Sequence, residues 1–151
     1  MKVSRQYEPQ RRARRRALQA LYQWKITGQQ AAEIIEQFFE EQDFSGVDED
    51  LFRMLVEGVI ESSEVLDQVL EPFIDRPAGQ LDLMEAVILK MASFELMHSR
   101  QVPMRVVLDE AIELARRFGA EQGHGFVNAV LDKAAPELQK AGEAVNPDSS
   151  K

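Results

Sequence analysis

Apolar side chains recur every three or four residues along most of the chain, and no stretch alternates apolar and polar positions for long enough to indicate a strand. This spacing predicts an all-α fold. The clusters DFSGVDED (residues 43–50) and RPAG (residues 76–79) interrupt the pattern, as loops and helix breakers do. We expect three to four helices on each side of RPAG, packed as two sub-bundles over about 10–74 and 80–136.

Four helices are predicted before RPAG. The first begins near Pro9, where a missing N–H costs little, and stops at Gly28. The second covers about 30–41, and the third follows Asp48 as its N-cap. The fourth, EVLDQVLEPF, is capped by one of the two preceding serines and is ended or kinked by its own proline. The inward-facing positions of the first helix are Ala13, Ala17, Leu21 and Trp24.

Three helices are predicted after RPAG. Asp82 caps the first of them, with Glu85 three residues later as in a capping box. The next covers about 103–119, and it places two arginines before a terminal glycine. The last covers about 124–135 and is expected to close at Pro136.

The two ends of the chain are predicted to lie outside this domain, as a flexible basic arm over 1–9 and a disordered polar tail over 139–151. With 151 residues and 44% hydrophobic content, the core needs no disulfide or metal, and there is no cysteine. No apolar stretch resembles a signal peptide or approaches the roughly 18 residues of a membrane span. We expect a cytoplasmic protein without a membrane segment.

Charge is divided unevenly along the chain. Residues 1–16 carry seven basic side chains against Glu8 alone, a net charge of +6, whereas the other 135 residues carry 11 basic and 25 acidic side chains, a net charge of -14. A phosphate responds to the field within about 10 Å at ordinary salt, so the overall charge of -8 does not exclude a polyanionic ligand. Two kinds of partner are therefore expected.

Five arginines in the six positions 11–16 begin the first helix, on a face nearly opposite its apolar positions. Their mutual repulsion and their position at the helix N-terminus cost stability, so local structure does not explain them. A nucleic-acid-binding face and a solvated basic tail are both compatible with the segment. Tyr22 falls within the same arc, where it either stacks on a base, enters a pocket of a partner, or is covered by another helix.

No arrangement of residues indicates catalysis. His98 and His124 lack a second histidine or acidic residue at metal spacing, and hydrogen-bonding or capping roles suit them. The glycine-rich motifs of nucleotide-binding proteins and the serine-hydrolase motif are absent, and adjacent carboxylates diverge on their helices. We expect no active site, no metal and no cofactor. The acidic run EEQDFSGVDED is either a solvated loop or a surface for a basic partner.

Four segments together carry a family resemblance: RRARRRALQALYQW, EPFIDR, VILKMASFEL and the long block VPMRVVLDEAIELARRFGAEQGHGFVNAVLDKAAPEL. Over about residues 10–138 the chain resembles the NusB family of bacterial transcription antitermination factors. The resemblance implies about seven helices in two sub-bundles and no enzymatic activity. It also implies a role with RNA polymerase on ribosomal RNA operons, in which a heterodimer with the ribosomal protein NusE binds boxA RNA. NusE is basic, which suits the acidic body of this chain.

The resemblance also assigns roles to individual positions. Tyr22 and Glu85 match positions at the NusE interface. For the protein without NusE, the resemblance is compatible with either a monomer or a homodimer. The residues that match RNA-binding positions, together with the neighbouring Arg15, are Arg11, Arg12, Arg14, Arg15, Phe73, Lys90 and Phe126.

This sequence departs from the family pattern at a few positions. Arg15 and Arg16 extend the basic run, Gly125 replaces a frequent basic residue, and Gln122 replaces a common acidic one. RPAGQLDL is also less acidic than its family counterpart. We therefore expect the arginines of residues 11–16 to contribute a larger share of the RNA affinity. A protein-interaction module whose arginines meet an acidic partner is the rival hypothesis, and a methyltransferase is a weaker one because the chain has no room for such a domain.

Overall fold

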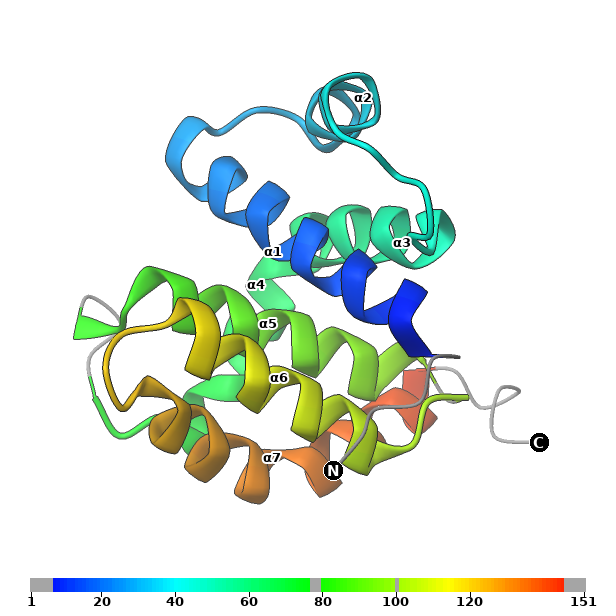
Figure 1. The fold of residues 1–151 in the computed structure, drawn as a ribbon. Coiled ribbons are helices and arrows are strands. Elements are labelled where there is room, and N and C mark those ends of the chain that lie inside the picture. Colours follow the sequence, from blue (N-terminus) through cyan, green and yellow to red (C-terminus); the bar gives the residue numbers. More distant parts are fainter. Residues whose placement is uncertain (1–6, 77–79, 100, 146–151) are drawn as a thin grey trace. The chain divides into compact units, whose positions relative to one another are not determined.

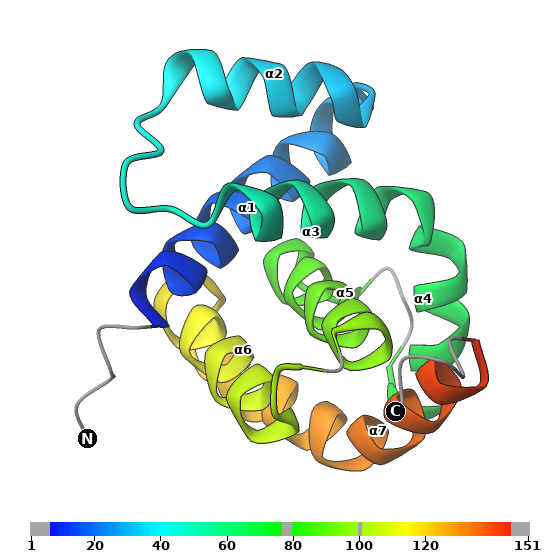
Figure 2. The ribbon, with the colours of Figure 1, turned by 90° about the vertical axis from the view of Figure 1, so that its right-hand side faces the viewer.

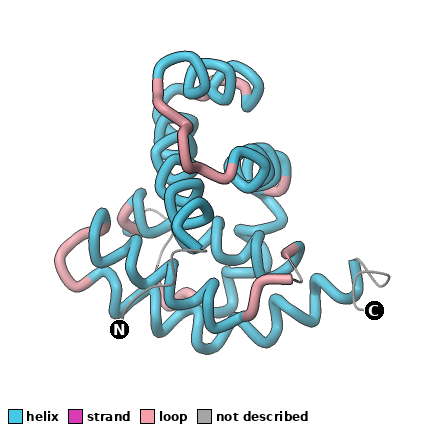
Figure 3. Tube along the Cα trace, turned by 45° about the vertical axis from the view of Figure 1, so that its right-hand side comes forward, coloured by secondary structure: helices cyan, strands magenta, loops and turns pink. Residues whose placement is uncertain are grey.

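The computed structural model describes residues 7–76, 80–99 and 101–145. Seven α-helices and a short 3-10 helix, and no strand, occur in these ranges, so the predicted all-α fold is confirmed. Helices account for most of the described chain and short loops join them (Figure 3). The helices form two compact units, residues 1–61 and 62–151.

The first unit contains α1 (Glu8–Thr27), α2 (Ala31–Glu41) and α3 (Glu49–Glu61), which pack against one another (Figure 1). Gly28 ends α1 as predicted, with a left-handed φ of 73° and its N–H donating to the carbonyl of Trp24. The predicted N-cap of α3 is confirmed, since Asp48 Oδ1 accepts the N–H of Leu51 at 3.0 Å. The end of α1 and the start of α3 are therefore set by local sequence.

The core of the first unit combines small side chains of α1 with an aromatic cluster. Phe52 of α3 lies 5.9 Å from Phe38 and 4.9 Å from Phe44 between ring centroids. Offset and edge-to-face contacts of this kind add to the stability from burial alone. Trp24 was predicted to face the core but is only half-buried, so the prediction is wrong for this residue. The buried side chains of α1 are Ala13, Arg14, Ala17, Leu18, Ala20 and Leu21.

The second unit contains α4 (Ser63–Leu70), the 3-10 helix η2 (Glu71–Phe73), α5 (Leu83–His98), α6 (Met104–Phe118) and α7 (Gly123–Val145). Figure 2 shows α4, α6 and α7 arranged around α5, and each of them packs against it. Twelve of the sixteen residues of α5 are buried, which makes this helix the centre of the unit. Pro72 lies in η2, so the predicted end of α4 is confirmed.

The division between the units is not where the breaker cluster RPAG was expected to place it. It falls between Glu61 and Ser62, because the apolar side of α4, Leu66 and Leu70, is buried and the helix packs against α5. Residues 77–79 of RPAG lie outside the described residues. A breaker cluster marks a bend in the chain, whereas packing decides which helices form a unit.

The last helix does not close at Pro136. Helix α7 continues through Pro136 to Val145, so residues 139–145 are helical and the predicted tail is wrong for them. An internal proline costs a helix about 3 kcal/mol. Burial of Leu138 beyond the proline, and close approach of Gly142 to the backbone of Met97, supply the packing that offsets this cost. A methyl group at Gly142 would collide with that backbone.

The structure describes only part of the two predicted terminal segments. Glu8 and Pro9 belong to α1, whereas the rest of the expected basic arm, residues 1–6, and residues 146–151 of the expected tail lie outside the described residues. Across the described part of the chain, no helix is long and apolar enough to cross a membrane.

Candidate nucleic-acid interface

The arginines of α1 separate by burial. Arg14 is only 4% exposed, so it does not share the surface of its neighbours. The predicted separation of basic and core arcs fails at this position because buried Leu18 follows Arg14 by four residues, about 40° around the helix, and extends the buried arc over it. The remaining four arginines, here called the basic face of α1, are Arg11, Arg12, Arg15 and Arg16.

Glu8 partly neutralises the basic face at its N-terminal end. Its carboxylate lies 3.7 Å from a guanidinium nitrogen of Arg11 and 3.7 Å from one of Arg12. The Arg12 side chain is 49% exposed and that of Arg11 only 18%, so the pair with Arg12 is the one that contributes little energy and is easily exchanged for a phosphate. Arg15 is partly exposed and has no hydrogen-bond or ion-pair partner within the described ranges, so no contact inside the protein has to break before it meets a ligand.

The loop between α2 and α3 is attached to the other end of the basic face. Arg16 Nη2 donates to the carbonyl oxygen of Asp43 at 2.9 Å, and its guanidinium lies 5.8 Å from the ring centroid of Phe44. Hydrogen bonds from Ser45, first from its backbone N–H, and the charge of Arg16 hold the pKa of Asp43 below its ordinary value. Arg16 therefore has a structural role that Arg15 lacks.

Tyr22 is 36% exposed, so among the described helices none covers it, in contrast to one of the three alternatives that the sequence left open. It lies seven residues after Arg15, on the same side of α1. Ile26, one turn further, is 61% exposed. The pair provides an apolar surface beside the basic face of α1, suitable for a protein partner.

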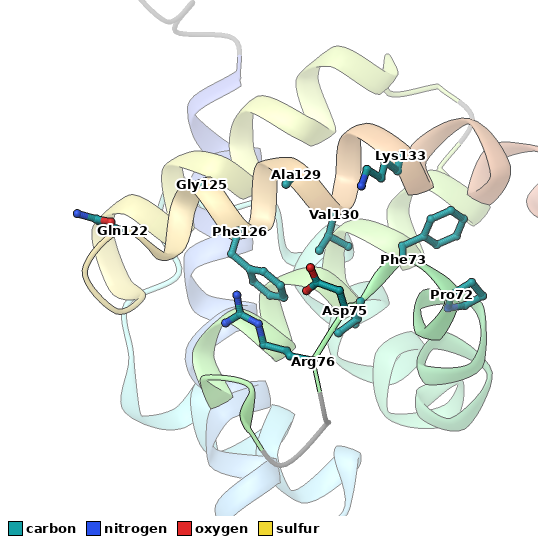
Figure 4. Close-up of a pocket in the computed structure, with 11 residues that line it drawn as sticks. Pro72, Phe73, Asp75, Arg76, Gln122, Gly125, Phe126, Ala129, Val130 and Lys133 are labelled. Atoms are coloured by element: carbon teal, nitrogen blue, oxygen red, sulfur yellow. The ribbon is translucent and has the colours of Figure 1, made fainter.

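Two of the predicted RNA-binding aromatics line one cleft in the second unit. The cleft has a volume of about 500 Å³, and its two walls are the segment Pro72–Arg76, which includes the end of η2, and the first three turns of α7. Figure 4 shows Phe126 and Arg76 together at one end, and Phe73 and Pro72 at the other. Segments about 50 residues apart in sequence thus contribute one aromatic ring each.

The cleft combines apolar and charged groups. The guanidinium of Arg76 lies 4.1 Å from the ring centroid of Phe126, a cation-π contact, and Lys133 lies two turns along α7 from Phe126. Asp75 also lines the cleft, so its charged side chains sum to only +1. Aromatic rings that stack on bases, flanked by cations that meet phosphates, are typical of single-stranded nucleic-acid sites.

Lys90, which the resemblance placed at the RNA, is buried with 5% exposure. Its ammonium donates to Ser63 Oγ at 2.9 Å and lies 3.1 Å from Asp67 Oδ1, both on α4. This charge is therefore already engaged within the second unit.

Glu85, which the resemblance placed at the NusE interface, is 4% exposed. Asp82 accepts the N–H of Glu85 at 3.1 Å, which confirms the predicted N-cap of α5. In a capping box the glutamate would return to the backbone of the cap residue, but this carboxylate instead accepts the N–H of Ala120 at 3.0 Å. It thus contacts the turn between α6 and α7.

Side chains that could bind a metal are not clustered within the described ranges. No group of three histidine, cysteine, aspartate or glutamate side chains there could hold a metal ion. His98 stacks against Phe94 with ring centroids 4.4 Å apart, and burial lowers the pKa of its imidazole. His98 is therefore integrated in the packing of α5.

Sequence reasoning missed Arg76 and Lys133, the two cations of the cleft. Lys133 follows Phe126 by seven residues, so helical periodicity places both on one face of α7 and could have identified it. No periodicity links Arg76 to Phe126, because the contact joins a loop after η2 to a distant helix. That residue could be found only from the tertiary structure.

The fold and these surfaces define a class: an all-helical protein whose basic helix face and aromatic cleft are suited to single-stranded nucleic acid. The NusB family model matches residues 11–136. The chain is 45% identical to the transcription antitermination protein NusB of Hahella chejuensis, over 92% of this chain and 93% of that protein. It is 49% identical to NusB of Xanthomonas campestris, over 85% and 81%.

A solved structure of T. maritima NusB has a similar fold, with a TM-score of 0.74 and 27% identity over 91% of this chain and 94% of the other. The chain belongs to the NusB family. Its relatives are named for transcription antitermination and not for a catalysed reaction, which agrees with the prediction of a non-enzymatic protein.

Proposed function

We propose that this protein is a bacterial transcription antitermination factor that binds single-stranded boxA RNA together with NusE and promotes transcription of ribosomal RNA operons. Membership of the NusB family supports the role in antitermination. The observation that carries RNA binding is the cleft of the second unit, where two aromatic rings and two cations come together. Since transcription in bacteria takes place in the cytoplasm, the protein acts there.

The RNA contacts divide by chemistry. Arg11, Arg12 and Arg15 of the basic face meet phosphates, which positions the strand, whereas Phe73 and Phe126 stack on bases. Single-stranded RNA is the suitable form because its bases are open to stacking, and those of duplex RNA are not. Arg14 and Lys90 are buried, so they contribute to RNA binding indirectly, through their contacts within the protein.

The protein partner meets the other part of α1. Tyr22 provides an exposed aromatic surface for NusE, and the net charge of -14 outside residues 1–16 attracts a basic protein. Glu85 contributes to this acidity but is buried, so its part in partner binding is indirect. The complex joins RNA polymerase during antitermination.

The test is binding of labelled boxA RNA and a scrambled RNA of equal length, each with and without NusE, measured by fluorescence anisotropy. The proposal predicts preference for boxA, stronger when NusE is present. Equal affinity for the two RNAs under both conditions would support the rival protein-interaction module. Tyr22→Ala should weaken NusE binding while leaving binding of RNA alone unchanged.

The salt dependence tests the electrostatic part. If three to five arginines each neutralise a phosphate, log K falls with log salt at a slope of about -2 to -3.5 for a single strand. A slope near zero would contradict phosphate binding by the basic face of α1. Sedimentation of the free protein over a range of concentrations determines whether it forms a homodimer.

A further inference from the structure

The two walls of the RNA cleft are each attached to α5 by one buried charged side chain. Glu85, in the first turn of α5, contacts the turn that leads into α7. Lys90, in the second turn, contacts α4, which leads into η2. Both residues are at most 5% exposed. They therefore cannot touch a bound strand without leaving these contacts.

The contact of Glu85 is specific to the start of α7. Its Oε2 accepts the N–H of Ala120 at 3.0 Å and lies beside Gly123, the first residue of α7. A carboxylate at a helix N-terminus is favoured by the helix dipole. A methyl group at Gly123 would collide with this carboxylate, so the glycine is required for the close approach. Phe126 follows only three residues later.

The contact of Lys90 fixes the opposite wall. The ammonium is shared between Ser63 Oγ and Asp67 Oδ1, the first and fifth residues of α4. Burial of an ammonium is costly unless it is paired, so this side chain holds α4 in one position on α5. The 3-10 helix η2 directly follows α4, and Phe73 is its last residue.

We propose that Glu85 and Lys90 are positioning residues for RNA binding, which set the separation of Phe126 and Phe73 without touching RNA. The inference rests on the proposed binding of RNA in this cleft. A strand that stacks one base on each ring needs the two rings at a fixed spacing, so displacement of either wall removes a stacking contact. It removes no phosphate contact, because neither ring is charged.

The role of Glu85 is tested by one substitution that should weaken RNA binding and a second that should restore it. Glu85→Ala should weaken boxA binding at least about fivefold, the lower limit for losing one base stack. Glu85→Gln should restore it, since an amide oxygen also accepts the N–H of Ala120. Failure of Glu85→Gln to restore RNA binding would show that the hydrogen bond to Ala120 is not what positions the cleft, and it would overturn the positioning role of Glu85.

The first glycine of α7 provides a second way to break the same contact. Gly123→Ala should reproduce the effect of Glu85→Ala, because a methyl group there displaces the carboxylate. The double variant Gly123→Ala with Glu85→Ala should bind RNA no more weakly than Gly123→Ala alone, as expected for two changes that break one contact. Additive losses would overturn the proposed contact.

The Lys90 arm uses the salt slope. Lys90→Met keeps the aliphatic stem and removes the charge, and it should weaken binding without changing the slope of log K against log salt. Lys133→Ala is the control, because removal of an exposed phosphate contact makes the slope shallower by about 0.7. A shallower slope for Lys90→Met would show direct contact with phosphate and overturn its positioning role.

Phe126→Ala separates failure of this inference from failure of the proposed function. If Phe126→Ala does not weaken RNA binding, the cleft is not the RNA site, and the inference fails with it. If Phe126→Ala weakens binding but Glu85→Ala and Lys90→Met do not, only the inference is wrong. All titrations use temperatures at which circular dichroism shows the variant folded. If Glu85→Ala does not fold, Gly123→Ala and the amide shift of Phe126 in its NMR spectrum carry the test.

Discussion

The basic face of α1 and the cleft of the second unit differ in charge and in how they are built. The basic face presents four arginines, one of them without a partner in the described residues, and it is formed by a single helix. The cleft has a net charge of only +1 but contains two aromatic rings, from segments far apart in sequence. Phosphates are recognised by charge and bases by stacking. The basic face therefore suits phosphates, and the cleft suits bases.

The largest effect is expected in the cleft. Phe126→Ala should reduce affinity for boxA RNA by about 1–3 kcal/mol, the value of one base stacked on an aromatic ring. The salt slope should not change, because no charge is removed. Anisotropy titrations at several salt concentrations measure both quantities.

Phe118→Ala is the matched control for this change. Phe118 is 36% exposed on α6 and does not line the cleft, so its removal should leave RNA affinity unaltered. Equal losses for the two variants would mean that stacking in the cleft does not distinguish it from other exposed aromatic residues.

The same contrast explains which residues could be predicted from sequence. The arginines of α1 were identified because 3.6-residue periodicity places them on one face. The position of Arg14 was missed because an aliphatic neighbour, Leu18, widens the buried arc. The pairing of Phe73 with Phe126 in one cleft, and the contact of Arg76, depend on packing between distant segments, which periodicity does not encode.

Helix ends, too, can be predicted only where they depend on neighbouring residues. Caps such as Asp48 and Gly28 were predicted correctly because their hydrogen bonds involve only a few neighbouring residues. Pro136 was predicted to end the last helix from the same kind of local rule. The helix continues because Leu138 is buried beyond it, a gain that the local sequence does not show. Local rules therefore fail where tertiary packing is stronger.

A smaller effect is expected on the basic face. Arg15→Ala should make the salt slope shallower by about 0.7 and weaken binding roughly fivefold near 0.1 M salt, the effect of one phosphate contact. Affinity for boxA and for scrambled RNA should fall equally, since phosphates carry no sequence information. The folding midpoint in urea should be unchanged, because Arg15 has no partner within the described ranges.

Arg16→Ala provides the contrast, since it removes the hydrogen bond to the carbonyl of Asp43 and should cost about 1 kcal/mol of folding stability. Arg105→Ala on α6, with a side chain 82% exposed, is a control for loss of charge elsewhere. If Arg105→Ala changed the salt slope as much as Arg15→Ala, the basic face of α1 would not be the site of phosphate contact.

The difference in charge between the two regions can also be reduced. Gly125→Lys adds to the cleft the kind of basic residue that the family resemblance leads one to expect there, and nothing lies within 4 Å of its Cβ position. It should increase RNA affinity and steepen the salt slope by about 0.7. Gly125→Ala is the control, because it raises helix stability by about 0.5–1 kcal/mol without adding charge. A change in slope with alanine would contradict an electrostatic cause.

The smallest expected effect concerns pH and separates the two units. Burial lowers the pKa of His98 from 6.5, so the unfolded chain binds a proton more readily than the folded one. The stabilisation from neutral His98 is complete above pH 6.5 and is lost as pH falls below it. Asp43, in the first unit, has a pKa lowered from 3.8 and loses its contribution only in stronger acid. The urea midpoint should therefore decrease between pH 7 and 5.5, and His98→Gln should reduce that decrease. An identical decrease in His98→Gln would show that another group, and not the centre of the second unit, responds to mild acid.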